Sequence, residues 1–130
     1  MSLFKSLQKS PRTISLFCDN FELNKSCSTI LQFLKGETSN NFNLELVSTF
    51  PTLDQLKYTY KINPIIMNTQ IPNLHRIMKL ESFDPVFGSN LQKCAREGRW
   101  NPKVSLWVDW ERKCIGNDLK SIQELLKLKG

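Results

Sequence analysis

Two segments in the N-terminal half alternate apolar and polar residues, and a helical pattern lies between them. Residues 13–17 and 42–47 alternate with a period of two, which is typical of β-strands. Between them, Asn24 or Ser26 can cap a helix that ends near Gly36. The apolar positions of this helix are Cys27, Ile30, Leu31, Phe33 and Leu34. This strand–helix–strand order predicts a parallel pair of strands with a right-handed crossover.

The middle of the chain contains two predicted helices separated by a less regular stretch. Pro51 begins the first of these helices, and apolar residues follow it at helical spacing. Residues 62–80 contain two prolines and predict an irregular connection with a short helix over 74–78. A second helix is predicted over 84–99, because an aspartate and a proline begin this segment and a glycine lies near its end.

The last part of the chain predicts a hairpin and a final helix. Residues 104–110 form the strongest predicted strand, and residues 114–115 return as its antiparallel partner. Asn117 or Asp118 then caps a helix. The whole order predicts a thioredoxin-like α/β fold, in which a parallel β-α-β unit and a C-terminal hairpin form a four-stranded mixed sheet flanked by helices.

The N-terminal residues have the composition of a mitochondrial targeting segment. Lys5, Lys9 and Arg12 precede the first acidic residue, Asp19, and four serines occur among the first 15 residues. We therefore predict a targeting segment over residues 1–12 and a single thioredoxin-like domain over residues 13–130. The alternative is a frayed basic N-terminus. Because the first predicted strand follows immediately, cleavage falls near Pro11, the segment is retained, or that strand is wrongly predicted.

Composition and charge exclude several classes of protein. The chain of 130 residues is 40% hydrophobic and 23% charged, as in ordinary globular domains. No apolar run approaches the roughly 18 residues needed for a membrane span, and no secretory signal is recognisable. The net charge is +6, but the basic residues are dispersed beyond the N-terminus and residues 93–103. We expect a monomer that has no nucleic-acid partner and no membrane span.

Four cysteines are the main candidates for chemistry. Cys18, Cys27, Cys94 and Cys114 form no CxxC motif, and His75 is the single histidine, which we expect at the surface. A metal site is therefore not expected. Without a secretion signal, reduced thiols are expected rather than disulfides. The cysteine in the returning strand is expected to be structural.

Cys94 lies in a basic stretch of the sequence. Lys93, Arg96 and Arg99 are close to it, and Glu97 is the acidic residue among them. Nearby cations favour the thiolate and attract anionic ligands, so these three basic residues are candidates for substrate binding. The alternative is that Cys94 is a small hydrophobic residue on the apolar face of the predicted helix.

Cys18, Cys27 and Pro102 occupy positions that matter in a thioredoxin-like fold. Cys18 ends the first predicted strand, and Cys27 lies in the first turn of the next helix, where the helix dipole favours a thiolate. Eight residues separate them, unlike a dithiol motif, so a loop residue and a core residue remain the alternatives. Pro102 precedes a strand where such folds place a cis-proline beside the thiol, and we assign it to substrate binding with its isomer left open.

Four stretches of the chain resemble a known family. They are SLQKSPRTISLF, FPTLDQL, QIPNL and DPVFGSNLQKCAREGRWNPKVSLWVDWERK. The chain is similar to a family of fungal mitochondrial redox proteins first found in a mitochondrial proteome. The resemblance implies a thioredoxin-like fold, mitochondrial localisation, the reduction of small toxic molecules and a catalytic role for the cysteine of LQKC, which is Cys94. It assigns no role to Cys18.

Two functions follow as hypotheses. In the first, the protein is a mitochondrial thiol oxidoreductase that reduces small molecules or mixed disulfides through Cys94. It would have no bound cofactor, and glutathione would serve as the external thiol. In the second, the domain is a non-catalytic structural or interaction subunit of a mitochondrial assembly, such as the ribosome or respiratory complex I. The absence of a CxxC motif favours the second, and the basic surroundings of Cys94 favour the first.

Overall fold

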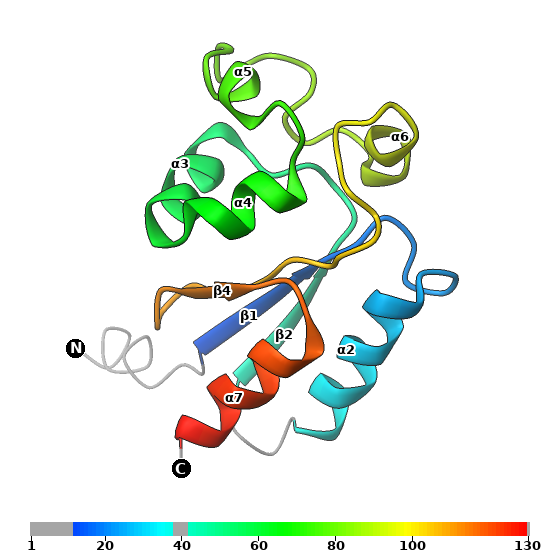
Figure 1. The fold of residues 1–130 in the computed structure, drawn as a ribbon, viewed down its shortest axis with the longest axis vertical. Coiled ribbons are helices and arrows are strands. Elements are labelled where there is room, and N and C mark those ends of the chain that lie inside the picture. Colours follow the sequence, from blue (N-terminus) through cyan, green and yellow to red (C-terminus); the bar gives the residue numbers. More distant parts are fainter. Residues whose placement is uncertain (1–11, 38–41, 130) are drawn as a thin grey trace, which may run out of the picture.

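A four-stranded mixed sheet forms the centre of the molecule (Figure 1). The computed structural model describes residues 12–37 and 42–129. The strands are β1 (Arg12–Phe17), β2 (Phe42–Val47), β3 (Trp107–Asp109) and β4 (Cys114–Gly116), in the order β2-β1-β3-β4. β1 and β2 are parallel, whereas β3 is antiparallel to both β1 and β4. The predicted parallel unit, the hairpin and the four-stranded mixed sheet are therefore confirmed.

Helices cover both faces of this sheet (Figure 1). They are α2 (Lys25–Gly36), α3 (Leu53–Ile62), α4 (Pro64–Gln70), α5 (Leu74–Met78), α6 (Leu91–Arg96) and α7 (Leu119–Lys129). Helices α2 and α7 lie on one face, and α3 to α6 lie on the other. The chain thus forms three layers with the sheet in the middle.

The core is divided by the sheet into two clusters of buried side chains. Ile14 and Leu16 of β1 pack with buried residues of α2 and α7, and we call this group the α2/α7 cluster. Phe17 packs with buried residues of α3, α4, α5 and α6, and we call this group the α3–α6 cluster. This division follows from the alternation of side chains along a strand. The α2/α7 cluster also contains Cys18 and Cys27, and the α3–α6 cluster contains Cys94. Cys18 and Cys27 therefore lie on one face of the sheet, and Cys94 lies on the other.

Local capping explains where several helices begin. The Asn24 side chain accepts a hydrogen bond from the backbone N–H of Cys27, so Asn24, not Ser26, caps α2. Thr52 and Gln55 form a reciprocal capping box at the start of α3. The Asp118 side chain accepts from the N–H of Ser121 at 2.9 Å in the first turn of α7. In each case a side chain satisfies a backbone donor that the helix itself leaves unpaired.

The helix predicted over residues 84–99 is wrong over its first half. Only α6, residues Leu91–Arg96, is helical there. Gly88 has a φ of +83°, a left-handed conformation that interrupts a right-handed helix. Its N–H donates to Phe50 O at 2.9 Å, and the Phe50 N–H donates to Ser89 O at 2.7 Å. These long-range hydrogen bonds replace the helical ones that the local pattern predicted.

Two other predictions differ from the structure in length. The strand predicted over residues 104–110 is regular only over Trp107–Asp109, although Leu106 O still accepts from the Phe17 N–H at 2.8 Å. The irregular stretch over residues 62–80 contains α4 as well as the predicted α5. Asn63 caps α4 and Pro64 occupies its first turn, an ordinary helix start that the weak apolar pattern concealed.

The first strand, β1, begins at Arg12. This start is one residue before that of the predicted strand, and Arg12 Nε lies 3.1 Å from Asp109 Oδ2. The Asp109 side chain is fully buried, and that of Arg12 is 10% exposed. The rest of the predicted targeting segment, residues 1–11, lies outside the described residues. Arg12 itself is part of the sheet.

Candidate functional site

Cys94 is placed by the short helix α6. The Asn90 side chain caps this helix by accepting from the Lys93 N–H at 3.0 Å. Cys94 is its fourth residue, and its backbone N–H donates to Asn90 O at 3.0 Å. Because Leu91 and Cys94 are three residues apart, they lie on the same buried face of α6, and Cys94 is only 1% exposed. The thiol is therefore held in the α3–α6 cluster, not on the surface.

Ser89 gives the Cys94 thiol a polar neighbour. Its hydroxyl oxygen lies 3.2 Å from Cys94 Sγ, and the same hydroxyl lies 2.6 Å from Val86 O. When the hydroxyl donates to Val86 O, its oxygen can accept from the Cys94 S–H. When the thiol loses its proton, the hydroxyl can rotate and donate to the thiolate. The pair can therefore satisfy both forms of the sulfur.

A pocket of about 380 Å³ opens beside Cys94 and Ser89. Its other polar lining residues are Asp84, Lys93, Glu97 and Arg99. Arg99 is paired with Glu97 at 2.6 Å, and both side chains are largely exposed. The lining therefore carries two cationic and two anionic groups around one thiol. Such a pocket suits a small ligand that bears both charges, or an anion held by the two cations.

The predicted substrate-binding residues fall into separate parts of the structure. Lys93 and Arg99 line the pocket beside Cys94. Arg96 is exposed and is not among the lining residues of that pocket. Pro102 is also exposed, and its carbonyl contacts the start of α2 instead. The structure thus brings two of the four residues to Cys94.

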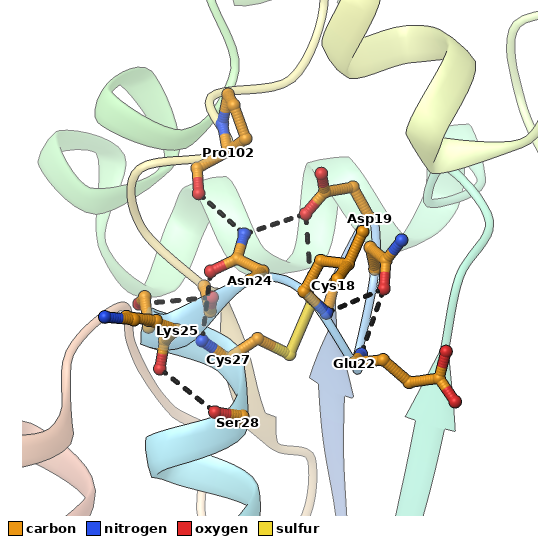
Figure 2. Close-up of a disulfide and its surroundings, with 12 residues drawn as sticks. Cys18, Asp19, Glu22, Asn24, Lys25, Cys27, Ser28 and Pro102 are labelled. Carbon is orange, nitrogen blue, oxygen red and sulfur yellow. Dashed lines mark hydrogen bonds between the residues drawn. A yellow bond between two sulfur atoms is a disulfide. The ribbon is translucent and has the colours of Figure 1, made fainter.

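Cys18 and Cys27 form a disulfide, so the prediction of reduced thiols is wrong for this pair (Figure 2). Cys18 directly follows β1, and Cys27 is the third residue of α2. Their Cα atoms are 6.2 Å apart, a separation that a disulfide spans. The tight turn between β1 and α2 brings together residues that their spacing in sequence did not suggest as a pair. Cys94 and Cys114 are free thiols.

Asn24 joins the disulfide segment to a distant loop (Figure 2). Its side-chain N–H₂ donates to Asp19 Oδ1 and to Pro102 O, each at 2.8 Å. Its side-chain oxygen accepts from the Cys27 N–H at 3.2 Å. No peptide bond within the described residues is cis, so the Pro102 peptide is trans. The loop position of Pro102 therefore contributes a backbone acceptor at α2 and not a cis-proline beside Cys94.

Sequence reasoning missed Ser89 as a neighbour of Cys94 for a definite reason. The two residues are five apart, and in the predicted continuous helix such residues do not face each other. The turn at Gly88 and the cap at Asn90 replace that geometry. A glycine followed by a serine and an asparagine is a signal for a loop and a cap, and it could have limited the helix to its second half.

Within residues 12–37 and 42–129, no group of three histidine, cysteine or acidic side chains is arranged to hold a metal ion. None of the helices over the same ranges has the length and hydrophobicity required to cross a membrane. His75 is exposed, as predicted.

The sequence matches a known family over most of its length. Residues 4–118 match the family described as "Protein of unknown function (DUF1687)". A Candida glabrata protein named "Putative redox protein FMP46, mitochondrial" is 54% identical over 127 residues, which cover 98% of each chain. A Saccharomyces cerevisiae protein of the same name is 44% identical over 97% of each chain. The resemblance to fungal mitochondrial redox proteins is thereby confirmed, and the protein is mitochondrial.

A solved structure is also similar to this chain. The solution NMR structure of a Saccharomyces cerevisiae protein has 45% sequence identity to it and covers 95% of both chains. The TM-score between the two structures is 0.57. The similarity therefore extends over nearly the whole length of both chains.

Proposed function

The chain belongs to the DUF1687 family, and on that premise we propose that it is a mitochondrial thiol oxidoreductase whose reacting group is Cys94. The observation that carries this proposal is the position of Cys94 Sγ, 3.2 Å from the Ser89 hydroxyl in the wall of an open pocket. The use of "redox protein" in the names of relatives is consistent with this chemistry. The substrate class is a small disulfide or mixed disulfide.

The proposed reaction is thiol–disulfide exchange. The Cys94 thiolate attacks one sulfur of a substrate disulfide, so a mixed disulfide forms and the other substrate sulfur leaves as a thiolate that takes up a proton. A glutathione-type thiolate then attacks the substrate sulfur of the mixed disulfide and releases the Cys94 thiolate. The second substrate sulfur thereby leaves as a mixed disulfide with the external thiol, and a second external thiolate attacks the glutathione-type sulfur of that product and releases the substrate sulfur as a thiol. The substrate gains two electrons, and two external thiols supply them and end as their disulfide.

Three side chains have distinct roles in this proposal. Ser89 donates a hydrogen bond to the thiolate, because its hydroxyl is within reach of the sulfur. Lys93 and Arg99 hold an anionic group of the substrate or of the external thiol at the mouth of the pocket. No bound cofactor is needed, since the electrons come from the external thiol.

An external thiol is proposed because no other cysteine shares the core cluster of Cys94. Cys18 and Cys27 pack in the α2/α7 cluster on the other face of the sheet. Cys114 is a partly buried residue at the margin of that same cluster. The arrangement supports a monothiol reaction over one that is resolved within the chain.

We also infer that the fold is thioredoxin-like. The order β2-β1-β3-β4, the parallel β1 and β2 pair and the C-terminal hairpin support this assignment. The placement of helices on both faces of the sheet agrees with it. Fold alone does not give the activity, so the function rests on Cys94 and its surroundings.

The test compares two single variants of the free cysteines. Turnover of 2-hydroxyethyl disulfide with reduced glutathione is measured for the wild type, Cys94→Ser and Cys114→Ser. We expect Cys94→Ser to lose the activity and Cys114→Ser to retain it, because only Cys94 of the two free thiols lines the pocket. Equal activity of Cys94→Ser and the wild type would refute the proposal.

The alkylation rate of each cysteine as a function of pH supplies a readout that does not require turnover. Peptide mass spectrometry of the folded chain should show Cys94 reacting faster in the wild type than in Ser89→Ala, because the variant removes the donor to the thiolate. If Cys94 is protected from alkylation in both proteins until they are unfolded, the thiol is a core residue and the pocket gives no ligand access to its sulfur.

A second candidate function is a non-catalytic subunit of a mitochondrial assembly. The observation that favours it is the 1% exposure of Cys94, together with the exposed apolar side chains of Leu23, Ile65 and Phe83. Sedimentation of a mitochondrial lysate separates the two functions. A subunit should migrate with a large complex, whereas the oxidoreductase should migrate at the size of the monomer.

A further inference from the structure

The Cys18–Cys27 disulfide closes the turn between β1 and α2 on the face of the sheet opposite Cys94. Cys18 is 1% exposed and Cys27 is fully buried. The α2/α7 cluster around them contains many buried apolar side chains, so the core on this face does not depend on the cross-link for its apolar packing. Chains of this length fold without disulfides. A structural need does not by itself explain the bond.

The segment between the two cysteines contains a locally hydrogen-bonded turn (Figure 2). The Asn20 side chain accepts from the N–H groups of Glu22 and Leu23, at 3.0 and 2.9 Å. Glu22 and Leu23 are exposed, and Leu23 retains 80% of its accessible surface. This turn lies beside the disulfide, and the hydrogen bonds of Asn20 within it are all local, including the one that its carbonyl accepts from the Asn24 N–H at 3.0 Å. Its opening would give a small thiol access to the sulfurs.

We propose that Cys18 and Cys27 form a reversible dithiol–disulfide couple, distinct from Cys94, that exchanges two electrons with small thiols of the glutathione class. A thiolate of this class attacks Cys18 Sγ, so a mixed disulfide forms at Cys18 and Cys27 leaves as a thiolate. A second thiolate attacks the sulfur of the bound small thiol, releases Cys18 and completes the oxidised small disulfide. The two protons of the small thiols pass to Cys18 and Cys27, and the reverse steps restore the bond.

The direction of attack follows from the position of Cys27 in α2. As the third residue of a twelve-residue helix, it lies in the first turn, where the helix dipole stabilises a negative charge. A better-stabilised thiolate is the better leaving group. Cys18 does not lie in the first turn of a helix, so no helix dipole stabilises its thiolate, and the carboxylate of Asp19 lies 3.8 Å from its sulfur. Cys27 is therefore the sulfur that leaves first.

The redox state of the couple has a structural consequence at a distance. In the disulfide form, Asn24 is fixed between its two cross-linked neighbours and bonds both the Cys27 N–H and Pro102 O. Reduction frees the ends of the segment over residues 18–27, so the cap and the contact with the Pro102 loop are less strongly held. The couple thus links the oxidation state of two cysteines to the loop that precedes β3.

The test equilibrates the full chain with mixtures of reduced and oxidised glutathione at constant pH. Samples are quenched with acid and alkylated with a maleimide, and the peptides that carry each cysteine are quantified. We expect Cys18 and Cys27 to become labelled together with one midpoint, and we expect the same midpoint in Cys94→Ser. If both remain unlabelled at every ratio until the protein is unfolded, the bond is structural and the proposal fails. Full labelling in the absence of any reductant also refutes it, because no bond then exists.

Two variants make the result independent of the activity of Cys94. In Cys27→Ser, oxidised glutathione should leave one stable glutathione adduct on Cys18, whereas Cys114→Ser should keep the wild-type midpoint. A folded Cys27→Ser protein that takes up no adduct would show that the site is closed to small thiols. Loss of turnover in Cys94→Ser with an unchanged midpoint separates the two sites, and failure of the turnover assay does not affect the midpoint.

Discussion

The two faces of the sheet hold their cysteines in different ways. On the α3–α6 face, Cys94 is a single free thiol that is packed among apolar side chains, with one hydroxyl and one open pocket beside it. On the α2/α7 face, Cys18 and Cys27 are cross-linked at a helix N-terminus and packed in an apolar cluster, and the Asn24 side chain bonds Asp19, the Cys27 N–H and Pro102 O beside them. Cys18, Cys27 and Cys94 are each at most 1% exposed. Burial alone therefore does not distinguish the chemistry, and the neighbouring groups do.

The largest effect is expected from the apolar packing that supports Cys94. Trp100 is 1% exposed, and its ring lies 6.3 Å from that of Phe17 and 6.1 Å from that of Phe50. Trp100→Ala should lower the free energy of unfolding by about 3–5 kcal/mol, because it leaves a large cavity. Denaturant unfolding measures this loss. The control is Phe83→Ala, at a side chain that is 82% exposed, which should change stability by less than about 0.5 kcal/mol. Equal effects of the two variants would mean that this face is not packed as described.

The next effect concerns the polar contact that anchors the start of β1. Asp109→Asn removes the charge that faces Arg12 and leaves a largely buried guanidinium without its partner. We expect a loss of roughly 3 kcal/mol, as found when one member of a buried ion pair is removed. Glu124→Gln, at an exposed position of α7, is the control.

The ion pair also makes a prediction about processing of the N-terminus, since cleavage after Arg12 would remove the partner of Asp109. A mature N-terminus beyond Arg12 in the purified mitochondrial protein would contradict this.

A moderate effect is expected from the cross-link on the other face. In oxidising buffer, the double variant Cys18→Ser/Cys27→Ser should be less stable than the wild type by about 2–3 kcal/mol, the loop-closure contribution for a loop of this size. In strong reductant the difference should shrink, because the wild type then lacks the bond as well. Thermal or denaturant unfolding in both buffers measures the change, and Cys114→Ser should show no such dependence on the buffer. If the stability difference between the double variant and the wild type is the same with and without reductant, the cross-link does not stabilise the α2/α7 face, and the contrast with the α3–α6 face is refuted.

The smallest effect on stability is expected from the charged rim of the Cys94 pocket. Arg99 and Glu97 have side chains that are 52% and 40% exposed, so Arg99→Ala should cost less than about 1 kcal/mol. Its effect on chemistry should be selective. The ratio of the Cys94 alkylation rates with anionic iodoacetate and neutral iodoacetamide should fall, because a cation that attracts the anion is removed. Arg112→Ala, in the turn between β3 and β4, should leave the ratio unchanged. An unchanged ratio in Arg99→Ala would show that Arg99 does not act on ligands of Cys94.

The accuracy of the sequence predictions varied with the range of the interactions involved. The caps at Asn24 and Asp118 were among the predicted alternatives, because a cap depends on a side chain and the backbone of the next turn. The helix over residues 84–99 was overpredicted, since the hydrogen bonds between Phe50 and the Gly88–Ser89 segment come from another part of the chain. Lys93 and Arg99 were expected near Cys94 and line its pocket, whereas Ser89 was missed.

The amino-acid sequence by itself determined the order of the strands and of most helices, the parallel unit followed by a hairpin, and the family to which the chain belongs. Those features depend on local periodicity, on capping residues and on similarity along the chain. Only the tertiary structure decided that Cys18 pairs with Cys27, that Pro102 faces α2, and that the sheet separates this pair from Cys94. The physical reason is that Cys27 and Cys94 lie on helices, and the face of the sheet that each helix covers is decided by packing between segments far apart in the sequence, which a local pattern does not contain.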